Sequence, residues 1–76
     1  MRKLTDLLIG DQGEMYSILD SELEQKLLEM GCTPGEKIHV VRQAPFHGPI
    51  AILLSSYMLS LSKDDAQSII IKQDDA

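Results

Sequence analysis

The chain has 76 residues, of which 43% are hydrophobic, and its 12 acidic residues against 7 basic ones give a net charge of -5. A chain of this length has room for one hydrophobic core, so we expect residues 1–76 to form a single domain, and the acidic balance argues against nucleic acid as a partner. No stretch approaches the roughly 20 apolar residues that span a bilayer, and the N-terminus lacks the pattern of a signal peptide, which predicts a cytoplasmic protein without direct membrane insertion.

The N-terminal residues 1–13 are expected to form a covering segment that places its leucines on the core. These leucines are Leu4, Leu7 and Leu8. Gly10 and Gly13 are typical of a turn, since glycine commonly separates elements. Residues 14–19 then hold enough apolar side chains for a short strand, and their imperfect alternation favours a bulge.

One amphipathic helix is the clearest local signal, and it is expected over residues 21–30. Ser21 and Glu24 have the spacing of a capping box, in which each side chain accepts from a backbone N–H at the start of the helix. Gly31 supplies a left-handed stop. The apolar residues at helical spacing are Leu23, Leu27 and Met30. Such a short helix is unstable alone, so this apolar face is expected to pack against a sheet.

Four more short segments alternate apolar and polar residues, which is the period of a half-buried strand. Their expected inward-facing residues are Ile38 and Val40, Ile50 and Ile52, Leu59 and Leu61, and Ile69 and Ile71. Residues 49–54 and 57–61 are expected to form a hairpin, and residues 68–72 the last strand. Residues 63–67 are expected to form one helical turn that Ser62 caps. Five short strands and one helix predict a mostly-β small barrel, closed or nearly closed.

Candidate catalytic and metal-binding side chains are scattered without a recognisable spacing. Cys32 follows the helix stop, where an apolar residue commonly packs back onto the helix, so we interpret it as a buried structural thiol. His39 lies on the outward phase of a strand and His47 in a loop, so both are expected to face solvent. The acidic pairs Asp64-Asp65 and Asp74-Asp75 are interpreted as a helix start and a solvated tail. We therefore predict no catalytic, cofactor-binding or metal-binding residue, and no enzymatic activity.

One loop places an aromatic residue among structure breakers. Its residues are Pro45, Phe46, His47, Gly48 and Pro49. A loop stiffened by two prolines loses little conformational entropy on docking, so we predict that it binds a protein partner and displays Phe46 to it. The alternative, in which Phe46 folds inward and plugs one end of the barrel, stays open.

Several segments, taken in order, resemble the FeoA family of small cytosolic proteins associated with bacterial ferrous iron uptake. The resemblance covers nearly the whole chain and is carried by Leu4-x-x-Leu7-x-x-Gly10, by residues 26–35 (KLLEMGCTPG), by Val41-Arg42-Gln43-Ala44-Pro45-Phe46-x-x-Pro49-Ile50, and by Leu59-Ser60-Leu61 with Ala66 and residues 69–71. The chain departs from the family pattern at Phe46 and His47, where the family more often has leucine and glycine.

The resemblance implies a fold and a function. The fold is an SH3-like small barrel of about five strands with the helix inserted after the first strand. The implied function is that of an accessory protein that docks on the cytosolic GTPase region of FeoB, the membrane iron transporter, and modulates transport. The family has no established catalytic activity, so the resemblance implies none here.

Two other functions stay open. The same small barrel is similar to the C-terminal domain of iron-dependent repressors of the DtxR type, which would make the chain a regulatory domain. The other is a direct ferrous-ion carrier, with transition metal ion binding through His39, His47 or carboxylates. Weak homo-oligomerisation also stays open.

Overall fold

The described part of the chain, residues 1–73 of a computed structural model, is built from six strands, two α-helices and a short 3-10 helix. The strands are β1 (Arg2–Lys3), β2 (Gln12–Ile18), β3 (Lys37–Gln43), β4 (Ile50–Leu53), β5 (Met58–Leu61) and β6 (Ile69–Gln73). The helices are η1 (Leu4–Asp6), α1 (Ser21–Glu29) and α2 (Lys63–Gln67). The mostly-β class and the single main helix are confirmed, and β1 is a sixth strand inside the segment expected only to cover the core.

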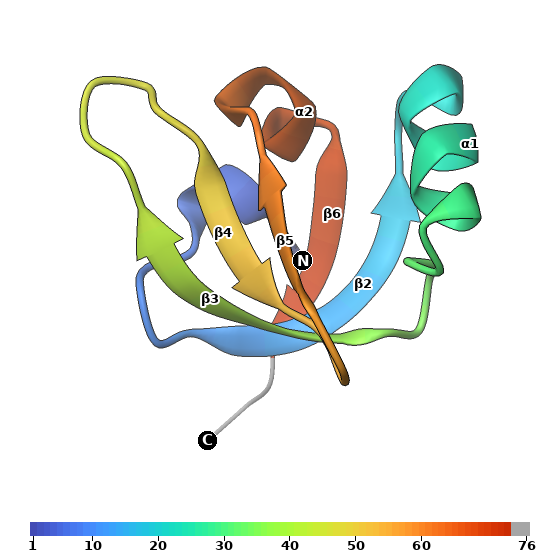
Figure 1. Ribbon diagram of the computed structural model, residues 1–76, viewed down its shortest axis with the longest axis horizontal. Helices are drawn as coiled ribbons and strands as arrows, with labels where there is room; N and C mark the ends of the chain where they lie inside the picture. Colours follow the sequence, from blue (N-terminus) through green and yellow to red (C-terminus); the bar gives the residue numbers. More distant parts are fainter. Residues whose placement is uncertain (74–76) are drawn as a thin grey trace.

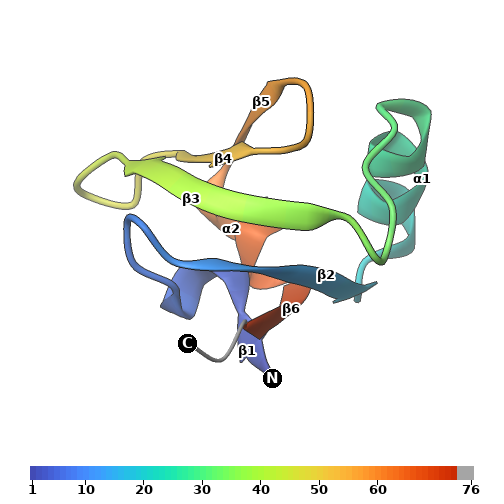
Figure 2. The ribbon, with the colours of Figure 1, turned by 90° about the horizontal axis from the view of Figure 1, so that it is seen from below.

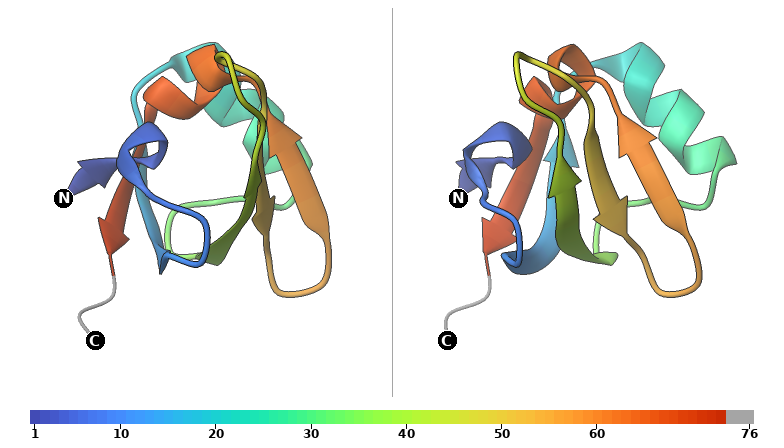
Figure 3. Two further views of the ribbon diagram at one scale, coloured as in Figure 1. Left: turned by 90° about the vertical axis from the view of Figure 1, so that its left-hand side faces the viewer. Right: turned by 60° about the vertical axis from the view of Figure 1, so that its left-hand side comes forward.

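The strands form one antiparallel sheet in the order β1-β6-β2-β3-β4-β5. The sheet curls strongly, and α2 lies across one end of the curl (Figures 1 and 3). Figure 2 shows the β3–β4 loop at one end of the long axis and α1 at the other. The curl gives the nearly closed barrel expected from the sequence, with β1 and β5 at its two edges.

Strand β2 starts earlier than predicted, because Gly13 belongs to the strand. It pairs with Ile38 of β3 and with Gln73 of β6. A Cβ atom on Gly13 would lie 2.6 Å from Cγ2 of Ile71 and 2.9 Å from the carbonyl oxygen of Lys72, so only glycine allows β6 to approach this closely. The predicted bulge is confirmed, since the β2–β6 register shifts between Met15 and Ser17.

Helix α1 is capped one residue earlier than predicted. A carboxylate oxygen of Asp20 accepts from the backbone N–H groups of Glu22 and Leu23, at 2.9 and 3.0 Å, and Ser21 is the first helical residue. A carboxylate both accepts these hydrogen bonds and interacts favourably with the positive end of the helix dipole. The helix ends at Glu29 with Met30 as its C-cap, and the φ of +79° at the following Gly31 confirms the predicted left-handed stop. No helix within residues 1–73 is long and apolar enough to cross a membrane.

The core lies inside the curl and is closed by α1 and η1. Its largest fully buried side chains are Leu4, Leu7, Met15, Leu27, Cys32, Val40, Ile52, Ile69 and Ile71. Two residues expected in the core are outside it: Leu8 is 69% exposed and Met30 is 41% exposed. Leu8 begins a tight turn that Asp11 closes, and Met30 follows the last helical residue, so neither stays on the inward face.

The β4–β5 hairpin is confirmed, with the Leu54 N–H donating to the Tyr57 carbonyl across the turn at 2.8 Å. The strands themselves are shorter than predicted, Ile50–Leu53 and Met58–Leu61. The Tyr57 ring packs against the core, and its hydroxyl donates to the Met30 carbonyl just after α1. The hairpin therefore helps to hold the end of the helix against the sheet.

Candidate functional site

The β3–β4 loop is a tight extension of the hairpin formed by its two strands. The Ala44 N–H donates to the Pro49 carbonyl at 3.0 Å, which continues the strand pairing. The Gly48 N–H donates to the Pro45 carbonyl at 3.2 Å, which closes a four-residue turn. Behind the turn, the amide of Gln43 donates to the Leu7 carbonyl and ties the end of β3 to the N-terminal segment. Both the tip and the base of the loop are thus fixed by hydrogen bonds.

Both central residues of the turn have left-handed backbone conformations. The φ angles are +56° at Phe46 and +64° at His47, which is the pattern of a type I′ turn. Such turns favour Asn-Gly, and a bulky residue at positive φ is uncommon because its Cβ crowds the backbone. A Cβ on Gly48 would lie 2.5 Å from Cβ of Ala44, so the turn also needs glycine at its last position.

Phe46 points into solvent at the tip of this turn. Its side chain is 95% exposed, the largest value among the exposed large apolar residues of the described chain. The alternative in which Phe46 plugs the barrel is therefore wrong. The structure brings the five predicted residues into one compact turn, whose most prominent feature is an aromatic ring on a fixed backbone.

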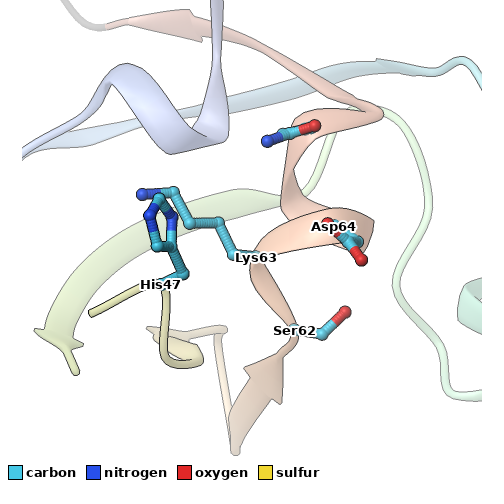
Figure 4. Close-up of a pocket in the computed structure, with 5 residues that line it drawn as sticks. His47, Ser62, Lys63 and Asp64 are labelled. Atoms are coloured by element: carbon cyan, nitrogen blue, oxygen red, sulfur yellow. The ribbon is translucent and has the colours of Figure 1, made fainter. Parts of the chain in front are cut away.

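A shallow hollow of about 260 Å³ lies between the loop and α2. Its lining consists of His47 from the loop with Ser62, Lys63, Asp64 and Gln67. In Figure 4 the Lys63 side chain extends toward the His47 ring, whereas Ser62 and Asp64 point away from it. Sequence reasoning missed this contribution of α2, because nothing in the pattern of residues 62–67 indicates which loop lies beside them.

Helix α2 itself forms as predicted. The Ser62 hydroxyl accepts from the Asp65 N–H at 3.1 Å, and Asp64 and Asp65 occupy the first helical turn. The second acidic pair, Asp74-Asp75, lies outside the described residues. The α2 side of the hollow is therefore a regular, capped turn that fixes the start of the Lys63 side chain.

Cys32 is the buried structural thiol expected from the sequence. It is fully buried, and its Sγ lies 3.7 Å from Sδ of Met15 as a weak hydrogen-bond donor. Burial, helped by the negative charge of Glu36, raises the pKa of the Cys32 thiol to about 11. A thiol with this pKa is protonated at neutral pH and is a poor nucleophile.

The histidines are not assembled with other metal-ligand side chains. His47 is exposed and His39 is half-buried on β3. Within residues 1–73 no three side chains of His, Cys, Asp or Glu gather closely enough to hold a metal ion. The candidate site is thus defined by the loop tip and its neighbour α2.

The comparisons with known proteins point to one family. Residues 2–73 match the family model described as the FeoA domain. A relative from Porphyromonas gingivalis, a Fe(2+) transport protein A/Fe(2+) transporter FeoB fusion protein, is 34% identical over 68 residues. This match spans 88% of the chain but only 8% of the fusion protein.

Solved structures agree with the fold. A FeoA-like protein from Clostridium acetobutylicum is 31% identical, with a TM-score of 0.81 over 96% of this chain and 90% of that one. A manganese-dependent transcriptional repressor (23% identity, TM-score 0.85) matches 95% of this chain and 41% of its own. Stenotrophomonas maltophilia FeoA complexed with zinc, described as an SH3 domain protein (18% identity, TM-score 0.80), matches 95% of this chain and 91% of its own. At these lower identities the last two matches show the fold alone, which is SH3-like.

Proposed function

Because the chain belongs to the FeoA family of ferrous iron transport, we propose that it is an accessory protein that docks on the cytosolic GTPase region of a FeoB-like transporter and modulates transport. The fusion relative supports the choice of partner, since it carries a similar domain and a FeoB transporter in one chain. The chain would act at the cytoplasmic face of the membrane. The contact is made by the β3–β4 loop, residues 45–49.

The observation that carries this proposal is the exposed ring of Phe46 on its left-handed turn. Aromatic side chains that enter a partner's pocket dominate the energy of many interfaces. Hydrogen bonds at the tip and base hold the loop before binding, so docking loses little conformational entropy.

A titration of the FeoB cytosolic GTPase region with the wild-type protein and with Phe46→Asn tests the proposal. Asparagine removes the ring yet suits a type I′ turn, so weaker binding cannot be ascribed to a misfolded loop. We expect the substitution to cost about 2 kcal/mol or more of binding free energy, which is about 30-fold in Kd.

Leu28→Ala is the matched control, because Leu28 is also an exposed apolar residue but lies on α1. It should leave Kd within about twofold, the usual effect of a residue outside an interface. If both substitutions weakened binding equally, the contact would not be specific to the loop. If the wild-type protein did not bind at high micromolar concentration, with or without nucleotide, the proposal that it docks on FeoB would be wrong.

The two other functions have weaker support. The likeness to the transcriptional repressor shows the fold alone. A ferrous-ion carrier would need ligands that meet, and nothing in the described part of the chain favours such a site.

A further inference from the structure

Charge is distributed very unevenly along this chain. Residues 37–63 contain three basic residues and no aspartate or glutamate, a formal charge of +3. The rest of the chain contains four basic and 12 acidic residues, a formal charge of -8, and together these give the net charge of -5. Residues 37–63 therefore carry a net positive charge in a protein that is acidic overall, because this segment holds no carboxylate side chain.

This acid-free segment forms one continuous side of the sheet. It spans β3, β4 and β5, which are consecutive neighbours in the strand order, and the first residue of α2. The β3–β4 loop is its outermost part, at one end of the long axis (Figures 1 and 2). The opposite end is α1 with its cap, which carries Asp20, Glu22, Glu24 and Glu29 against Lys26 alone.

Two positive side chains near the loop are available to a partner. Arg42 is exposed near the end of β3, and Lys63 lines the hollow beside His47. Within residues 1–73 neither side chain forms a hydrogen bond or an ion pair. Figure 4 shows the Lys63 side chain directed toward the loop. The exposed ring of Phe46 therefore has two cations near it, and neither is paired with a carboxylate within residues 1–73, although Asp64 lines the same hollow as Lys63.

We propose that the protein docks loop-first on an acidic protein surface that surrounds an apolar recess for the Phe46 ring. This inference rests on the proposed function and names the chemistry of the surface on FeoB: carboxylates facing Arg42 and Lys63. The two cations near the loop orient the molecule during the encounter, because the α1 end, with its four carboxylates against Lys26, is repelled from the surface that attracts them.

An acidic protein fits the loop better than an anionic membrane. Attachment to anionic lipid through charge requires clusters of about four to eight Lys and Arg residues, whereas the loop is flanked by two available cations. A single aromatic ring held on a tight turn is suited to a recess of defined shape on a protein surface.

The test is the rate of association with the FeoB cytosolic GTPase region, measured by stopped flow at several salt concentrations. Lys63→Glu should slow association about three- to ten-fold at low salt and flatten its salt dependence, with a smaller change in the dissociation rate. Glutamate suits the first turn of α2, so the helix is retained, and urea unfolding of the variant checks this.

Lys26→Glu is the matched control, since it changes the net charge by the same amount at the α1 end. It should leave the association rate within about 1.5-fold if local charge steers the encounter. Equal slowing by both variants, or by neither, would overturn the inference and leave docking itself intact. Failure of the wild-type protein to bind the GTPase region would overturn both proposals, and so would retention on vesicles with 30% phosphatidylglycerol without binding to that region.

Discussion

At the scale of single residues, Phe46 combines two properties that folding alone does not favour. Its ring is 95% exposed, so it contributes almost no apolar burial, and its backbone is left-handed. A non-glycine residue held in that region costs on the order of 1–3 kcal/mol. The proposed binding role would explain why such a residue stands at the tip, because strain of this kind is often retained at functional sites.

This reasoning predicts that Phe46→Asn stabilises the fold while it weakens binding. Asparagine tolerates the left-handed conformation, so we expect the free energy of unfolding to rise by about 1 kcal/mol and the Tm by about 4–8 °C. Thermal and urea unfolding would measure both quantities. Tyr16→Asn, at another exposed aromatic residue but on β2, should instead lower stability, because asparagine is disfavoured in strands.

If Phe46→Asn lowered the Tm, the turn would gain more from the phenylalanine ring than it loses to backbone strain. The ring would then have a structural role, and its exposure could no longer be taken as a sign of binding. His47 gives an independent check of backbone strain in the turn. The FeoA resemblance puts glycine at that position, and glycine adopts a φ of +64° without strain.

At the scale of elements, the contact between β2 and β6 depends on Gly13. Gly13→Ala would place a methyl group against Cγ2 of Ile71 and the Lys72 carbonyl. Because one of these atoms belongs to the backbone, the strands must separate, and we expect a loss of about 1–3 kcal/mol in the free energy of unfolding. Ser17→Ala, further along β2, should change it by less than about 0.5 kcal/mol. Urea unfolding of both variants would measure the difference, and similar values would show that β2 and β6 can separate at little cost.

Periodicity predicted most elements because each strand carries its own alternation. The inward pairs of β3, β4, β5 and β6 were all placed correctly, from Ile38 and Val40 to Ile69 and Ile71. Two of the errors lie where pairing with a distant strand decides the structure. Gly13 is in a strand because β6 lies against it, and β1 exists because Arg2 pairs with Ile71. The local sequence pattern indicates neither of these two strand pairings.

At the scale of the whole molecule, the candidate site was predictable only in part. The loop residues 45–49 are singled out by the sequence because structure-breaking residues surround one aromatic residue, and their binding role stays a prediction. The hollow beside α2 and the separation of charge between the two ends depend on how the sheet curls, and that is set by contacts between distant strands. The same contacts make the interior one connected core, in which Cys32 lies between β2 and the end of α1.

Cys32 therefore reports on the stability of the whole fold. Since burial raises its pKa to about 11, above the ordinary value of 9.0, the native thiol at pH 8 is protonated as well as inaccessible. Only an opened state, in which the pKa returns toward the ordinary value, supplies the reactive thiolate. The Cys32 N–H donates a hydrogen bond to the Leu27 carbonyl, so exposing the thiol requires α1 to leave the sheet. In a domain with one core we expect that opening to be global unfolding.

The prediction is that alkylation of Cys32 by iodoacetamide at pH 8 follows the unfolding equilibrium. The logarithm of the rate should rise linearly with urea, with the slope of global unfolding, when closing is fast relative to alkylation. Phe46→Asn, at a residue remote from the thiol, should slow the reaction about fivefold, because about 1 kcal/mol of added stability lowers the unfolded population by that factor. An alkylation rate that changes neither with urea nor with Phe46→Asn would contradict this prediction. It would mean that α1 opens on its own, and that the two ends of the molecule are not one cooperative unit.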